Sequence, residues 1–242
     1  MKFNKKVGLS LFSLLFLITT KVFAGSFWFP IDGVYPYTVE VTSFPDLDRT
    51  VGVIKTRMGE KGRKANGCIA LTKSYPCTNA YKKDYSVWAY KKDGGGIWNV
   101  AGINYISDSY FMWYDNHFGY DFSDRATGYA GKGVHAVEDG VIKAIDSDWG
   151  RVTIEHNIKG VIYRTTYTHM DISKTKADMT VGKTVWRWYK LGVVSNKAPA
   201  VYSFGNHLHF TTEKKLSDGS YKMVDPYGQW ENGVEVEPYL WE

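Results

Sequence analysis

The sequence lacks helical periodicity, basic runs and linkers. Outside the first 24 residues no long segment repeats its apolar residues every 3.6 positions, which argues against a helical fold. No internal repeat, low-complexity stretch or Pro/Ser-rich tether divides the 242 residues. The formal net charge of +5 includes four lysines of residues 1–24 and no acid from that segment, so the remainder carries about 5 − 4 = +1. So balanced a chain gives no electrostatic support for nucleic-acid binding.

The one strongly apolar run, residues 7–18, is shorter than the ~20 residues that a membrane-spanning helix needs. It follows Lys2, Lys5 and Lys6 and precedes Val22-Phe-Ala24, which ends on a small residue. This layout predicts a secretory signal peptide over residues 1–24, with an uncleaved anchor as the alternative. We therefore expect an exported protein, periplasmic or secreted, with no stable membrane span once the leader is removed.

Cysteine is scarce, with only Cys68 and Cys77. In an exported protein an even, closely spaced pair predicts a disulfide, which would contribute about 2–3 kcal/mol by closing a short loop. The alternative is half of a metal site. The spacing is too wide for C-x₂₋₄-C and no histidine lies nearby, so cysteine-rich structural zinc sites are excluded by composition.

The rest of the sequence predicts short strands separated by turns. Aromatic residues make up 16% of the chain, as is typical of β-rich cores, although they would also suit a substrate groove. We predict three hairpins, which pair residues 87–90 with 97–100, residues 134–137 with 141–145, and residues 152–156 with 161–168. The predicted fold class is mostly β.

Histidine is also scarce, at 6 residues, but it is clustered in the second half. In His117-Phe-Gly-Tyr-Asp121 the first and last residues point to the same face of an extended chain, and Gly119 leaves room for a close approach to the backbone. An imidazole and a carboxylate so placed can share a metal. Alone the motif is weak, because such pairs are usually hydrogen-bonded surface residues.

Gly205-Asn-His207-Leu-His209-Phe is more specific. On a strand it places two imidazoles on one face and two apolar side chains on the other. Zinc in catalytic sites takes three N or O protein ligands and keeps one open position. His117, Asp121 and either His207 or His209 would complete such a set.

The last candidate is Tyr167-Thr-His169, at the end of an apolar strand and so able to reach into a cleft. Tyr167 itself could donate to an oxyanion or simply pack. The helical H-E-x-x-H motif of other zinc proteases is absent. His135 and His156 lie beside turn residues, and we expect both to be ordinary, partly exposed strand residues.

Three blocks, His117-x-Gly-x-Asp121, Tyr167-x-His169 and His207-x-His209, occur in this order. Together they resemble the lysostaphin/LytM-type zinc endopeptidases, over roughly residues 110–230. The resemblance implies an antiparallel β-sheet core with a narrow groove. It divides the chain into a signal peptide (1–24), a β-rich N-terminal accessory region (25–109) and a zinc endopeptidase domain (110–242). Residues 123–132 depart from the family, being longer and more polar than the usual connection.

Carried over to these positions, the resemblance implies one Zn²⁺ per chain held by His117, Asp121 and His209. His169 and His207 would lie beside a zinc-activated water, and either is a candidate general base. The implied function is hydrolysis of peptide bonds in bacterial cell-wall peptidoglycan. The bond, the wall attacked, the oligomeric state and any inhibition of the cleft by residues 25–109 stay open.

Two other classes of protein compete with this prediction. One is a non-catalytic regulator of cell-wall amidases on the same fold, although known regulators of that kind have lost metal ligands, whereas all five positions are filled here. The other is a glycan- or wall-binding module that uses the Trp and Tyr side chains, with a purely structural metal. A structural site would have four protein ligands rather than three.

Overall fold

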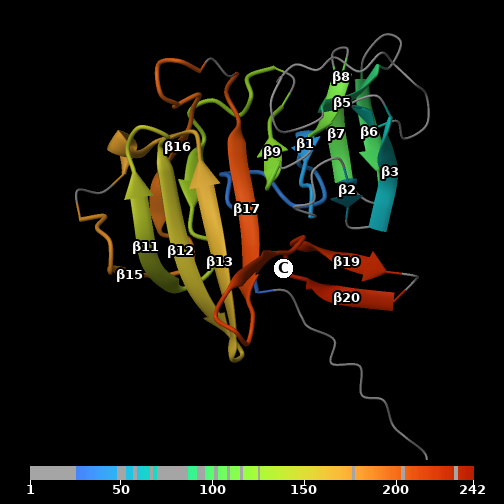
Figure 1. Cartoon of the computed structure of the whole chain (residues 1–242). Helices are drawn as coiled ribbons and strands as arrows, with labels where there is room; N and C mark the ends of the chain where they lie inside the picture. The colour runs from blue at the N-terminus through green and yellow to red at the C-terminus, as the bar shows by residue number, and fades with distance from the viewer. Residues whose placement is uncertain are drawn as a thin grey trace, which may run out of the picture.

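The computed structural model shows a mostly β protein, as predicted (Figure 1). It describes residues 26–47, 53–56, 59–65, 68–69, 87–91, 96–100, 103–107, 110–114, 117–124, 126–175, 178–202, 205–231 and 234–242. Within these ranges the helical structure is confined to one 3₁₀ turn, Ile172–Lys174. The predicted signal peptide and Cys77 lie outside the described residues, so the leader and the Cys68–Cys77 disulfide stay predictions. In the described part, no helical segment has the length and hydropathy of a membrane span.

A large sheet forms the body of the molecule, with strand order β15-β11-β12-β13-β17-β9-β1-β8-β5 and β18 beside β17. Its strands are β1 (Val41–Phe44), β5 (Val87–Lys91), β8 (Tyr110–Tyr114), β9 (Tyr120–Phe122), β11 (Gly140–Asp146), β12 (Arg151–Ile158), β13 (Val161–Thr168), β15 (Thr184–Val185), β17 (Leu208–Lys215) and β18 (Tyr221–Met223). Only β1 and β8 pair in parallel within it. Antiparallel pairing therefore dominates, as expected.

Smaller sheets flank the large one. They are β10 (Gly133–His135) with β16 (Lys190–Val194) and β14 (Met170–Asp171); β19 (Tyr227–Glu231) with β20 (Val234–Tyr239); β2 (Val53–Thr56) with β3 (Gly59–Ala65) and β4 (Cys68–Ile69); and β6 (Gly96–Val100) with β7 (Ile103–Ser107). The first of these sheets matters most for the site, because β14 directly follows His169 and β16 is followed by Ser195, whose N–H donates to the His169 carbonyl.

Of the three predicted hairpins, one is confirmed. β12 and β13 pair antiparallel in register from Val152–Tyr167 to Ile158–Val161. The pairing of residues 134–137 with 141–145 is wrong, because β10 pairs with β16 in a different sheet while β11 pairs with β12 and β15. The pairing of 87–90 with 97–100 is also wrong, since β5 pairs with β8 and β6 with β7. In both cases the turn signal shows where the chain reverses, but the first strand, β10 or β5, pairs with a strand further along the sequence.

The hydrophobic core is shared by the N-terminal and C-terminal parts of the described chain. Phe27, Phe29 and Ile31 are buried in the same cluster as Phe210 and Trp241. Phe27 also forms a bridge with Trp241 at the other end of the described chain. Burying rings of this size removes large apolar areas from water and so contributes strongly to folding. The division at residues 109/110 stays a prediction, but apolar residues of 26–47 pack in the same core as residues of the C-terminal half.

His135 and His156 are buried, with 7% and 1% of their surfaces exposed, so the expectation of partial exposure is wrong. His156 has polar partners on both ring nitrogens: Nδ1 donates to the Asp139 carbonyl (2.9 Å) and Nε2 lies 2.8 Å from Thr165 Oγ1. Burial lowers the pKa of His156 to about 4, and the nearby Asp139 and Glu138 groups only partly oppose this. The folded protein thus holds a neutral imidazole.

This buried imidazole predicts a pH-dependent stability. Since the folded pKa of about 4 lies below the ordinary 6.5, the unfolded chain takes up the proton first as the pH falls. The contribution of His156 is present above pH 6.5 and is lost toward pH 4, on the order of 3 kcal/mol at most. Urea unfolding of the wild type and His156→Gln at pH 7, 5.5 and 4.5 measures it. The variant should be less stable at pH 7 but lose less on acidification; equal losses would contradict the assignment.

Candidate metal centre

Two neighbouring strands bring the predicted ligands together. Asp121 on β9 is the direct cross-strand partner of His209 on β17. His209 Nδ1 lies 2.9 Å and His117 Nε2 lies 3.3 Å from the same oxygen, Asp121 Oδ1. One ligand atom from each of the three residues falls within 4.8 Å of the others. His117 itself precedes β9 rather than lying on it, so the i, i+4 pair is joined through a bend at Gly119.

The outer nitrogen of His117 is fixed by the N-terminal part of the chain. His117 Nδ1 donates to the Phe44 carbonyl of β1 at 2.9 Å, and Asp46 N donates to the His117 carbonyl at 2.7 Å. With its proton on Nδ1, the ring presents a bare Nε2 toward Asp121. Metal-binding histidines commonly have a carbonyl partner of this kind, which sets both tautomer and orientation. The sequence offered no signal for Phe44, because the contact uses only its backbone.

The carboxylate of Asp121 is buried but surrounded by imidazoles. Burial raises its pKa, yet the charges of His117 and His207 and hydrogen bonds from His117 and His209 hold the pKa well below its usual range. For His117, burial by itself lowers the pKa, but the Asp121 carboxylate outweighs burial, so the pKa of His117 is raised. Burial lowers the pKa of His209. Two imidazoles and an ionised carboxylate form a donor set that fits zinc, with room for one further ligand.

Gly119 is required by a close approach. A Cβ at this position would lie 2.6 Å from the Phe210 carbonyl oxygen and 2.8 Å from His209 Nε2. Both distances are shorter than real Cβ contacts allow, and the carbonyl belongs to strand β17. The expectation that Gly119 admits a close neighbour is therefore confirmed, and the neighbours are the Phe210 carbonyl and the ring of His209.

His169 and His207 complete the constellation of five predicted residues. Their ring centroids are 4.5 Å apart, and His207 Nε2 lies 3.7 Å from Asp121 Oδ1. His169 Nδ1 donates to the Lys197 carbonyl and His207 Nδ1 to the Gly205 carbonyl, each at 2.8 Å. In both rings the backbone therefore holds the proton on Nδ1, which leaves Nε2 as the acceptor.

The backbone of His169 is strained. Its φ of +68° is in the left-handed region, which residues other than glycine seldom adopt. Its N–H donates to the Trp149 carbonyl, and its carbonyl accepts from both N and Oγ of Ser195. Strain that surrounding bonds enforce in this way clusters at functional sites. Burial, then the neighbouring His207, lower the pKa of His169 to about 4, which keeps the imidazole neutral.

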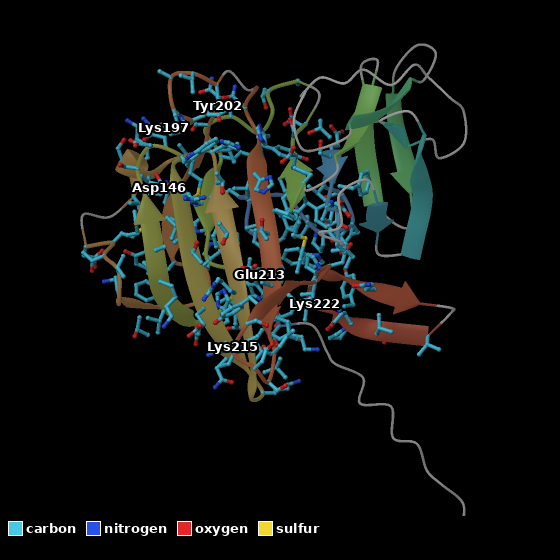
Figure 2. All side chains as sticks on the ribbon, in the orientation of Figure 1. Asp146, Lys197, Tyr202, Glu213, Lys215 and Lys222 are labelled. Carbon is cyan, nitrogen blue, oxygen red and sulfur yellow. The ribbon has the colours of Figure 1, made fainter. Side chains whose placement is uncertain are left out.

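A hollow opens beside His169. The cavity, about 490 Å³, is lined by both apolar and polar residues, among them Met170, Ile172, Ser195 and Lys197. Figure 2 shows Lys197 and Tyr202 at the same end of the large sheet. Tyr167, by contrast, is fully buried and its hydroxyl accepts from Val137 N, so it packs in the core and does not face the site.

The polar connection of residues 123–132, which departs from the family pattern, contacts the strand that carries the histidine pair. Ser123 Oγ donates to the Asn206 carbonyl at 3.1 Å, and Gly128 lies so close to Asn206 that a Cβ would be 2.0 Å from the same oxygen. Asn206 directly precedes His207. This connection therefore supports the His207 backbone.

Several solved structures are similar to part of this chain. A zinc-containing peptidase from Vibrio cholerae is 27% identical, over 45% of this chain and 30% of its own, with a TM-score of 0.33. The catalytic domain of the antimicrobial peptidase lysostaphin from Staphylococcus simulans is 23% identical, over 57% and 89%, with a TM-score of 0.33. The catalytic domain of the prophage-encoded M23 protein EnpA from Enterococcus faecalis is 22% identical, over 46% and 75%, also with a TM-score of 0.33. No family model and no curated protein matches the sequence.

The last two of these structures are named as lysostaphin and as an M23 protein, which is the group of peptidases that the three sequence blocks resemble. The chain spans less than a third of the Vibrio cholerae protein, and the likeness is confined to that part. Because the TM-scores are low, the geometry of the five residues, rather than overall likeness, supports the function proposed below.

The contact at Gly119 yields a test of the centre. Gly119→Ala should push the His209 ring out of position and weaken zinc binding about 10- to 100-fold, as losses of ligand orientation typically do. Competition with a chromophoric chelator measures the affinity. Gly205→Ala is the matched control, because a Cβ there meets nothing within 4 Å. Equal zinc affinity in both variants would show that the ring position does not depend on Gly119.

Proposed function

We propose that this protein is an exported zinc metalloendopeptidase that hydrolyses peptide bonds in bacterial peptidoglycan. The observation that carries the proposal is the convergence of His117, Asp121 and His209 on one point, with two more imidazoles beside it. When bound, zinc lowers the pKa of water toward ~7 and polarises a carbonyl, which is the chemistry that amide hydrolysis needs.

In this proposal His117 Nε2, Asp121 Oδ1 and His209 Nδ1 hold the metal. The Phe44 carbonyl fixes the His117 ring, and the β9–β17 pairing fixes the other two ligands. Three protein ligands leave a position open for substrate or water, as in catalytic zinc sites. The filled ligand set argues against a non-catalytic amidase regulator on the same fold.

His169 and His207 are the proposed proton carriers. Each has Nδ1 committed to a backbone carbonyl, so each offers Nε2 to a proton from the attacking water and can return it to the leaving amine. The lowered pKa of His169 keeps it in the accepting form at neutral pH. The hollow lined by Met170, the residue after His169, and by Lys197, whose carbonyl accepts from His169, gives a peptide substrate a place to lie beside the centre.

Peptidoglycan as the substrate is supported by the order of the three sequence blocks and by the predicted leader, which would bring the protein to the wall. The test is digestion of purified peptidoglycan by residues 25–242, with mass spectrometry of the released fragments. Metal-dependent release of cleaved peptides is expected, and the fragments identify the bond.

Asp121→Asn, His209→Ala and chelator treatment should each abolish release. Asp218→Asn is the matched control, because Asp218 lies in an exposed turn beside Ser220 and far along β17–β18 from the centre. Circular dichroism should show that the chelated protein stays folded, since a structural zinc would instead take the fold with it. Intact, zinc-loaded protein that cleaves no wall type would contradict the proposal.

The proton carriers make a separate prediction. His169→Ala and His207→Ala should each retain one zinc per chain, because neither supplies a proposed ligand atom. The variant that removes the general base should lose about 10²–10⁴-fold in kcat, and the other should lose less. Zinc content by atomic absorption and turnover of a soluble stem peptide measure the two properties. Losses of activity that merely follow losses of zinc would contradict these roles.

A further inference from the structure

A second cluster lies away from the metal centre, in the turn between β15 and β16. Tyr189 N donates to the Trp186 carbonyl at 3.0 Å, which closes a four-residue turn with Trp188 in its third position. The φ of Trp188 is +72°, and turns that require a positive φ there normally place glycine or asparagine. A tryptophan at such a position is an outlier that the surrounding structure must enforce.

The contact that holds Trp188 in this conformation comes from His135, which lies under the Trp188 indole. The imidazole stacks on the Trp188 indole, with centroids 4.2 Å apart and planes inclined by 3°. His135 Nδ1 donates to the Trp188 carbonyl at 3.0 Å, and His135 Nε2 lies 2.8 Å from Asp32 Oδ1. Ring and backbone of Trp188 are thus both fixed by one buried residue, although 37% of Trp188 stays exposed.

A second exposed indole stands beside the first. Trp28, 42% exposed, meets Trp188 edge-on, with centroids 5.8 Å apart. The Arg187 guanidinium lies over the Trp28 ring at 4.7 Å and bonds to Glu242 at 2.7 Å, while Trp28 Nε1 also donates to Glu242. We call Trp28, Arg187 and Trp188 the aromatic platform.

The charges around the aromatic platform limit what can bind it. Arg187 is balanced by Glu242 and by Glu138 at 3.9 Å, and His135 faces Asp32. No excess of positive charge is offered to a nucleic acid or an anionic lipid, and a purely apolar partner would have to bury these ions. A pyranose fits both features. Its C–H face packs on an indole, and its hydroxyl edge bonds to guanidinium and carboxylate groups.

The aromatic platform is remote from the metal centre. Trp188 lies two residues before β16, and the far end of β16, Val194, is followed by Ser195, which forms a bridge with His207. At about 3.3 Å per residue, the seven steps from Trp188 to Ser195 place the aromatic platform on the order of 20 Å from the metal centre. A ligand bound to the aromatic platform therefore leaves the metal centre free to bind a peptide.

We propose that the aromatic platform binds the neutral glycan strand of peptidoglycan and so anchors the enzyme while the metal centre cuts the peptides. This assignment rests on the proposed function, because that function makes a polymer of N-acetylated pyranoses part of the substrate. The strained turn already holds the Trp188 ring in one orientation. Binding therefore costs little conformational entropy at this side chain, which favours affinity.

The test is calorimetric binding of the zinc-loaded protein to soluble oligomers of N-acetylglucosamine, a neutral glycan of N-acetylated pyranoses that carries no carboxylate. Trp28→Ala and Trp188→Gly should each weaken binding at least about tenfold, as loss of a central aromatic anchor does. Glycine suits the φ of +72°, so Trp188→Gly should keep the turn. Tyr37→Ala, which removes a 66% exposed ring stacked on Tyr35 and outside the platform, should bind like wild type.

Cleavage of a short soluble stem peptide is measured on the same variants and should be unchanged, with thermal unfolding as the check on folding. Absence of glycan binding by the wild type, or binding of stem peptides in place of glycan, overturns the proposal. Wild-type glycan binding by folded Trp28→Ala and Trp188→Gly overturns it too. Glycan binding that depends on the two tryptophans supports the platform even where no peptide is cleaved, and only the enzymatic proposal then fails.

Discussion

The buried carboxylate of Asp121 is the constraint on which the rest of the centre depends. A charge in this position is stable only with close partners, and the imidazoles of His117, His207 and His209 supply them. Its position is set by the β9–β17 pairing, and that pairing has a close approach at Gly119. The β1 strand, from the N-terminal part of the chain, then fixes the outer side of His117. The order and pairing of strands in the sheet thus set the positions of the three proposed ligand residues.

The sequence predicts the candidate site residues better than the strand pairings and backbone groups that position them. The spacing of His117 with Asp121 and of His207 with His209 identifies residues that do come together, although His117 reaches Asp121 through a bend at Gly119 and not along one extended strand. The β12–β13 hairpin was predictable from its local turn signal. The partners of β10 and β5 were not, since a turn signal says where a chain reverses and not which distant strand it joins. The Phe44 carbonyl carries no side-chain signature at all.

Two of the non-glycine residues with positive φ lie at the two proposed sites. His169 is held by backbone bonds beside the metal centre, and Trp188 is held by His135 in the aromatic platform. In each case an unfavourable backbone conformation presents a ring in a fixed orientation, and the packed core of the protein provides the stability that offsets it. A polymer with a peptide part and a sugar part suits a protein with two such sites.

The most direct test of the central claim is X-ray absorption at the zinc edge of protein loaded with one equivalent of metal. The proposed centre predicts a first shell of nitrogen and oxygen only, with two imidazoles at about 2.0–2.1 Å, and loss of that shell in Asp121→Asn. A sulfur ligand near 2.3 Å would place the zinc at Cys68 or Cys77 instead. That result, or an unchanged shell in Asp121→Asn, would contradict the assignment of His117, Asp121 and His209 as the ligands.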